Sequence, residues 1–229
     1  MDLHLLGSLL HISDPTLPIG GYTHSNGLET YVQLGIVHNP ASAAAYVSQM
    51  LSANLHFNDA AFVCLAYNAV KARDFDELLR LDEELTALKL PIEIRNASQK
   101  LGLRLIKIFR RQKEFELAAK FENAILRKET GGNYAIAFGV YTSLLEIPLR
   151  EALYAFYYNA AAGMVTNAVK LVPLGQLDGQ DILFNMQTVI AGLIDKTITL
   201  DRDLVGVCNI GFDIRCMQHE RLYSRLYMS

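Results

Sequence analysis

Three side chains near the end of the chain are of types that bind metal ions. Cys208, Cys216 and His219 supply two thiols and one imidazole, ligands that suit nickel, copper or zinc. Their spacing, CX7CX2H, corresponds to no closed metal site, and ordinary packing positions are the other interpretation. The sequence therefore leaves open a metal-binding protein with these three residues as ligands.

No other pattern in the sequence indicates a catalytic site or a nucleotide-binding site. The chain has no GxxxxGK[ST] phosphate loop, no GxSxG nucleophile elbow and no HExxH zinc helix. His11, His24 and His38 stand alone beside polar neighbours, where an imidazole is more often a capping or surface group than a ligand. We therefore predict no catalytic residue, no enzymatic activity and no cofactor.

The most unusual segment covers residues 13–29 and reads SDPTLPIGGYTHSNGLE. Two prolines fix φ, and the Gly-Gly pair that begins at Gly20 permits backbone conformations closed to other residues, so we expect a defined turn. Ser25 is expected to cap the helix that follows. A defined turn that is rich in hydroxyl groups but lacks a nucleophile–base pair suits a surface that recognises a partner rather than a catalytic site. A purely structural turn is the alternative.

Helical patterns run through the rest of the chain and must position that turn. Apolar residues recur at helical spacing, and no sustained strand alternation occurs. Asn39-Pro40 is typical of a helix start, Asp74 can cap another helix, and Pro173 to Gly175 separate two more. The pattern predicts an all-α protein, a single-domain bundle of roughly eight to ten helices over residues 1–229.

Composition excludes several classes of protein. A net charge of -3 offers no global field for nucleic acid or for an anionic membrane. Three scattered cysteines and a start without a basic region ahead of a long apolar stretch predict a cytoplasmic location. The most apolar run, residues 152–170, contains Asn159 and Asn167, so we interpret it as a buried helix. We expect neither nucleic acid nor a membrane as partner.

A basic segment extends from residue 95 to residue 113 and contains no acidic residue. Four of its cations fall on one helical stripe, namely Lys100, Arg104, Lys107 and Arg111. The preceding segment, residues 74–84, is rich in acids, which favours two adjacent solvated faces of opposite sign. A docking surface for an acidic protein is the next interpretation, and RNA binding would require the positive charge to be unpaired.

Four motifs resemble those of one family, in the order expected. LPIGGYTHSNGLE, IEIRNASQKLG, KLVPLGQLDGQ and the ending MQHERLYSRLYMS resemble the motifs of the UreF family of urease accessory proteins. Each motif alone is weak, but together they cover nearly the whole chain and are specific. Two features depart from the family, since position 21 is glycine where another small residue is frequent, and the N-terminus is short.

The resemblance implies an all-helical protein without catalytic activity. UreF proteins bridge UreH (UreD in many bacteria) and the GTPase UreG, so that nickel enters apo-urease in a GTP-dependent step. The resemblance also implies a homodimer and an influence on the GTPase cycle. The partner-binding residues that it implies are Pro18, Gly20, Tyr22, His24, Ser25, Gly27, Glu29, Pro173, Gly175, Gln176, His219, Glu220, Arg221, Tyr223, Arg225 and Leu226. A nickel metallochaperone that uses Cys208, Cys216 and His219 is the alternative.

The last residues of the chain form a second candidate element. HERLYSRLYMS places Leu222 and Leu226 at helical spacing, and a short terminal segment is ordered only when something holds it. We therefore expect a helical tail that packs beside the PIGGY turn, with Arg225 stacking on Tyr22 or donating to its hydroxyl. Turn and tail together would recruit UreG.

Overall fold

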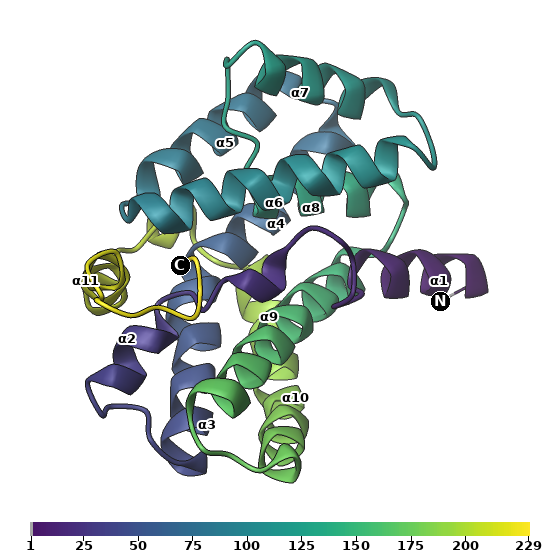
Figure 1. Cartoon of the computed structure of the whole chain (residues 1–229). Helices are drawn as coiled ribbons and strands as arrows, with labels where there is room; N and C mark the ends of the chain where they lie inside the picture. Colours follow the sequence, from purple (N-terminus) through teal and green to yellow (C-terminus); the bar gives the residue numbers. More distant parts are fainter. Residues whose placement is uncertain (1) are drawn as a thin grey trace.

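The structure, a computed structural model, describes residues 2–229 and is helical throughout (Figure 1). Eleven α-helices and no strand occur in this part of the chain. Their bounds are α1 Leu3–Ile12, α2 Leu28–Gln33, α3 Pro40–Gln49, α4 Asp59–Ala72, α5 Phe75–Leu88, α6 Ile92–Arg110, α7 Glu116–Leu126, α8 Tyr134–Leu144, α9 Leu149–Leu171, α10 Gln176–Ile198 and α11 Ile210–His219.

The all-α prediction is confirmed, but the predicted number of eight to ten helices is too low for the part of the chain described. The two helices that were not foreseen are α1 and α11, each only 10 residues long. Helices of this length form through tertiary contacts rather than through their own propensity. Neither helix has a capping side chain such as Asn39 provides for α3, so the pattern within one short segment gives little warning of them.

Local capping signals position several helices as the sequence predicts. The Asn39 side chain accepts from the Ser42 amide at 2.8 Å, and Ser42 Oγ accepts from the Asn39 amide at 3.0 Å. Asp74 Oδ1 accepts from the Glu77 amide at 2.9 Å. Each bond satisfies an amide that the first helical turn leaves without a partner.

The core is built around α4, α8 and α9. Helix α8 is buried along nearly its whole length, from Ala135 to Ser143, so it carries no solvent-facing polar stripe. The apolar run at residues 152–170 lies within α9 and contributes buried residues such as Leu153 and Tyr157, as the sequence predicts. No helix within residues 2–229 has both the length and the apolar character needed to cross a bilayer.

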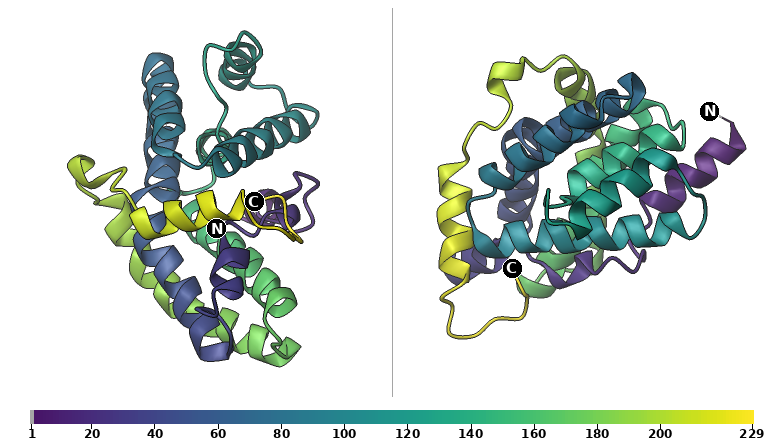
Figure 2. Two further views of the ribbon diagram at one scale, coloured as in Figure 1. Left: turned by 60° about the vertical axis from the view of Figure 1, so that its left-hand side comes forward. Right: turned by 90° about the horizontal axis from the view of Figure 1, so that it is seen from above.

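The chain between α1 and α2 runs alongside α6, and the last residues return to the same place (Figure 1, Figure 2). At one end of this path the ring centroids of His11 and Phe109 are 5.3 Å apart. Further along, Arg104 Nη1 donates to the Ile19 carbonyl at 2.8 Å. The fold thus places residues 13–29, helix α6 and the end of the chain on one face.

Candidate partner-binding site

Gly20 adopts a conformation that supports the predicted turn. Its φ of 88° is left-handed, a region that residues with a Cβ rarely enter. A Cβ here would also collide with the Arg104 guanidinium, which is held by its hydrogen bond to the Ile19 carbonyl. A single 3₁₀ turn follows, from Gly21 to Thr23. The turn is therefore shaped by its own glycine and fastened to α6.

Helix α11 packs directly on the far end of this segment. Gly27 has a φ of 78°, and a Cβ on it would lie 2.8 Å from the sulfur of Cys216. Thr30 Oγ1 in α2 donates to the Arg215 carbonyl in α11 at 3.0 Å. Close contact between α2 and α11 therefore requires glycine at position 27, and it places the residues after α11 next to the turn.

Residues 220–229, which we call the tail, are not helical, so that part of the prediction is wrong. After α11 ends at His219 the chain forms turns and bends. The reason lies in where the backbone donors go. The Leu226 amide donates to Glu29 Oε1 at 2.8 Å, and the Tyr227 amide to Glu29 Oε2 at 3.2 Å. These bonds replace those that a helix would make within itself.

The end of the tail is hydrogen-bonded to the turn segment. The backbone oxygen of Ser229 accepts from the amides of Ser25 at 2.5 Å and Asn26 at 3.0 Å. Ser25 Oγ donates to the same oxygen at 2.8 Å, and the Met228 amide donates to the Thr23 carbonyl at 2.9 Å. The tail packs beside the turn, as predicted, but its hydrogen bonds to this segment go to residues 23–29 rather than to the PIGGY residues 18–22. We call the contacts between residues 23–29 and 226–229 the clasp.

Ser25 does not cap α2, contrary to the prediction. The residue at the cap position is Gly27, and no side chain caps the helix. The buried Ser25 hydroxyl is committed to Ser229 instead. A cap pattern in sequence cannot reveal this, because the competing acceptor lies 204 residues away.

A largely buried hydrogen-bonded network of His219, Glu29 and Glu93 lies next to the clasp and supports it. His219 Nδ1 lies 2.8 Å from Glu93 Oε2 in α6, and its Nε2 lies 3.3 Å from Glu29 Oε2 in α2. The His219 side chain is 1% exposed. Since an ionised carboxylate only accepts hydrogen bonds, both ring nitrogens donate when the imidazole carries two protons. The imidazole therefore bridges two carboxylates, one from α2 and one from α6.

Arg225 joins this network and does not contact Tyr22 as expected. Its Nη1 donates to Glu93 Oε1 at 2.6 Å. Within residues 2–229 no hydrogen bond or cation–π contact joins Arg225 to the Tyr22 ring, which is 71% exposed. Because Glu93 accepts from both His219 and Arg225, it connects α11 and the tail to α6.

His24 lies next to the clasp and is held by the tail and by α9. Its Nδ1 makes a 2.8 Å hydrogen bond with Ser229 Oγ, and its carbonyl accepts from Asn167 Nδ2 of α9 at 2.8 Å. Burial lowers the pKa of His24, and the positive charges of Lys100 and Arg104 lower it further. These effects favour the neutral imidazole.

The predicted site residues divide into a buried and an exposed group. His24, Ser25, Glu29 and His219 are buried and hold the surface in place rather than form it. The exposed members are Pro18, Tyr22, Arg221, Tyr223, Arg225 and Leu226. Glu220 is half-buried. Large exposed side chains such as Tyr223, which is fully exposed, and Leu226, which is 68% exposed, suit contact with another protein.

The loop between α9 and α10 is not joined to the clasp. Pro173, Gly175 and Gln176 are exposed there, and the Gly175 amide donates to Asp178 Oδ2 at 2.8 Å. No hydrogen bond or ion pair of the described residues links this loop to the tail. The motif therefore occupies a separate position, beyond the end of α9.

The side chains of the three candidate metal ligands lie in different environments. Cys216 is buried against Gly27, and burial raises the pKa of its thiol, which disfavours the thiolate that binds metals. The exposed Cys208 Sγ donates to Asp213 Oδ2 at 3.3 Å, and His219 faces Glu29 and Glu93. Among residues 2–229 no group of three or more His, Cys, Asp or Glu side chains is arranged to hold a metal ion. The metallochaperone alternative is thus not favoured.

Three residues of the site were missed from sequence. From sequence, Glu93 would be interpreted as an acid in the first turn of a helix that complements the helix dipole. Arg104 would be interpreted as part of a solvated helix face, and Asn167 as a polar residue within a core helix. In the structure each binds the turn or the tail. Only the motif IEIRNASQKLG, which contains Glu93, could have indicated one of them.

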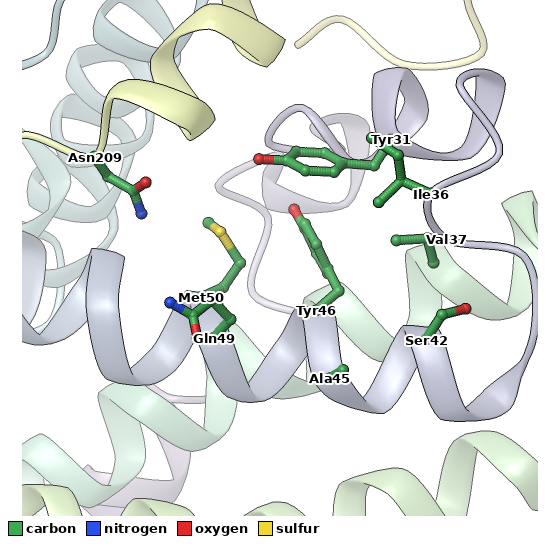
Figure 3. A pocket seen from close by; sticks show the side chains of 9 residues that line it. All are labelled: Tyr31, Ile36, Val37, Ser42, Ala45, Tyr46, Gln49, Met50 and Asn209. Atoms are coloured by element: carbon green, nitrogen blue, oxygen red, sulfur yellow. The ribbon is translucent and has the colours of Figure 1, made fainter.

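A cavity of about 390 Å³ opens beside α2 and α3. Figure 3 shows Tyr46 extending from α3 toward the ring of Tyr31, and the two ring centroids are 5.2 Å apart. Met50 and Asn209 complete its far side. None of the site residues predicted from sequence lines this cavity, so the exposed partner-binding candidates lie elsewhere.

Comparison with known proteins gives consistent matches. A family model described as UreF matches residues 37–187. A protein of Actinobacillus pleuropneumoniae serotype 5b (strain L20) is 50% identical over 224 residues, 98% of this chain and 99% of the relative. A protein of Haemophilus influenzae (strain PittEE) is 46% identical, over 98% of this chain and 95% of its own length. A protein of Arthrobacter sp. (strain FB24) is 32% identical, over 97% of this chain and 96% of its own length. All three are named urease accessory protein UreF.

Proposed function

This chain belongs to the UreF family of urease accessory proteins, and we propose that it bridges UreH/UreD and the GTPase UreG during urease maturation. In this role it allows GTP-dependent insertion of nickel into apo-urease and influences the GTPase cycle of UreG. It acts in the cytoplasm, as a homodimer within the accessory complex, and not as an enzyme.

The clasp is the observation that carries this proposal. Two segments almost 200 residues apart in sequence are hydrogen-bonded to each other, as when Leu226 donates to Glu29 with a separation of 197 residues. The result is one ordered surface that exposes Tyr22, Tyr223 and Leu226. An ordered surface with exposed aromatic and aliphatic side chains is typical of protein recognition. We infer that this surface receives UreG.

The test compares two arginines of the tail. Arg225→Ala removes the ion pair with Glu93, whereas Arg221 is exposed and its side chain makes no hydrogen bond or ion pair in the described residues. Arg225→Ala, and separately deletion of residues 222–229, should leave a folded helical protein that fails to bring UreG into a complex with UreH/UreD. Arg221→Ala should retain recruitment. Undiminished recruitment by the Arg225→Ala protein in a pull-down would overturn the proposal.

Nickel dialysis separates the bridging role from the metallochaperone alternative. A bridging protein should take up no stoichiometric nickel at neutral pH, because Cys208, Cys216 and His219 face different surroundings. Tight uptake that is lost in Cys208→Ser and in Cys216→Ala would favour the alternative instead.

A further inference from the structure

Helix α6 exposes a row of positive charges with no acidic partner. Lys100, Lys107 and Arg111 are exposed, and none of them forms an ion pair within residues 2–229. Arg104 is exposed as well, but its guanidinium binds the Ile19 carbonyl. We call these four residues the basic stripe. At 1.5 Å per residue, a stripe from 100 to 111 is about 16 Å long.

The acidic residues of α5 do not pair with the basic stripe, which is solvated, as in the interpretation favoured from sequence. Glu77 pairs with Arg80 in its own helix, and Glu84 pairs with Arg202. Asp82 is buried and accepts hydrogen bonds from residues 130–133, including the Gly132 amide at 2.6 Å. The positive charge of the basic stripe therefore faces solvent, and the two faces of opposite sign are not paired.

The basic stripe borders the turn. Arg104 fastens the turn through the Ile19 carbonyl, and the charges of Lys100 and Arg104 act on His24. The chain that leads into the turn runs along α6 in both views (Figure 1, Figure 2). A partner seated on the exposed Tyr22 would therefore meet these cations.

Unpaired charges of one sign have a physical consequence on a protein of the opposite net charge. The whole chain carries -3, so the basic stripe is a local positive field on a negative background. Such a patch attracts a complementary negative surface, speeds its association and selects its orientation, and it does so less at high salt.

We propose that the basic stripe docks an acidic face of UreG when that GTPase binds the turn. This inference rests on the proposed function and adds the chemistry of the contact. A protein partner is favoured over nucleic acid because binding a long polyanion generally calls for a broadly basic domain, whereas here the rest of the molecule would repel it.

The test reverses the three cations that do not hold the turn. The variant K100E/K107E/R111E keeps Arg104 and should remain folded, because exposed unpaired charges contribute little to stability. We expect its association with UreG, measured by biolayer interferometry with UreH/UreD present, to slow by about tenfold or more at low salt. The difference should shrink as salt is raised.

The matched control is K71E/K128E/K196E, which makes the same change in net charge at exposed lysines that form no ion pair in the described residues. It should associate at close to the rate of the wild type. Equal slowing in both triple variants would show that only total charge matters and would overturn the inference.

Two further outcomes are decisive. If the wild type binds UreG and K100E/K107E/R111E binds it equally well, the inference fails while the proposed function stands. If the wild type fails to bind UreG even with UreH/UreD, the proposed function itself fails. Loss of binding to a fluorescent RNA oligonucleotide, with binding to UreG unchanged, would assign the basic stripe to nucleic acid and overturn the inference.

Discussion

His219 Nδ1 in the last turn of α11 lies 2.8 Å from Glu93 Oε2 in the first turn of α6, although the two residues are 126 positions apart in sequence. The same imidazole approaches Glu29, the residue that accepts from the amides of Leu226 and Tyr227. His219 therefore holds both carboxylates on which the tail depends.

Replacing His219 by alanine should release the tail. Glu29 would remain buried without the imidazole that faces it, and the loss of a hydrogen-bond partner by a buried carboxylate costs about 1–3 kcal/mol. We expect faster hydrogen exchange at the amides of Leu226, Tyr227 and Met228. His38→Ala is the control, since His38 is exposed. Unchanged protection of the three amides would show that the tail does not depend on His219.

Replacing Gly20 by valine should distort the turn more than it destabilises the protein. A β-branched residue at a φ of 88° is strained by roughly 1–2 kcal/mol, and its Cβ would displace Arg104. We expect a modest fall in melting temperature and a large loss of urease activation in cells.

Gly21→Ala is the matched control for this variant. A Cβ on Gly21 has no neighbour within 4 Å, and its φ is not positive. It should leave both melting temperature and activation close to those of the wild type. A fall in activation that is merely proportional to lost stability in Gly20→Val would indicate a turn with only a structural role.

Acidification should weaken the clasp through His24. Burial, Lys100 and Arg104 lower its pKa in the folded state, so the unfolded chain binds a proton more readily. The stabilising contribution is complete above the ordinary histidine range near 6.5 and is lost as pH falls through the lowered pKa. His24→Asn should therefore show a smaller drop in melting temperature between about pH 7.5 and 5 than the wild type. Identical pH profiles would contradict this role for His24.

Tyr227→Phe should be neutral or stabilising. The Tyr227 side chain is buried, and its hydroxyl has no hydrogen-bond partner. A buried hydroxyl without a partner costs about 1–3 kcal/mol, so removing it while keeping the ring should raise or preserve the free energy of unfolding in urea. Tyr227→Ala should lower it through lost packing. A clear destabilisation by phenylalanine would mean that the hydroxyl is satisfied in solution.

The sequence by itself determined the features that depend on near neighbours. Asn39 and Asp74 cap helices because the amides that they satisfy are three residues away. Residues 152–170 form a largely buried helix because apolar side chains occupy most of its length and leave only a narrow exposed strip. The turn at Gly20 could be predicted because glycine, which has no Cβ, permits the left-handed conformation.

Only the tertiary structure decided what the tail and its supports do. The tail, with ten residues, is too short to form a helix without tertiary contacts. Its amides therefore donate to distant acceptors such as Glu29 and Thr23. Ser25 likewise donates its hydroxyl to the distant Ser229 backbone oxygen instead of capping α2. Glu93 and Arg104 carry no local signal of their partners, because a charged side chain on a helix face binds whatever group the fold brings within reach.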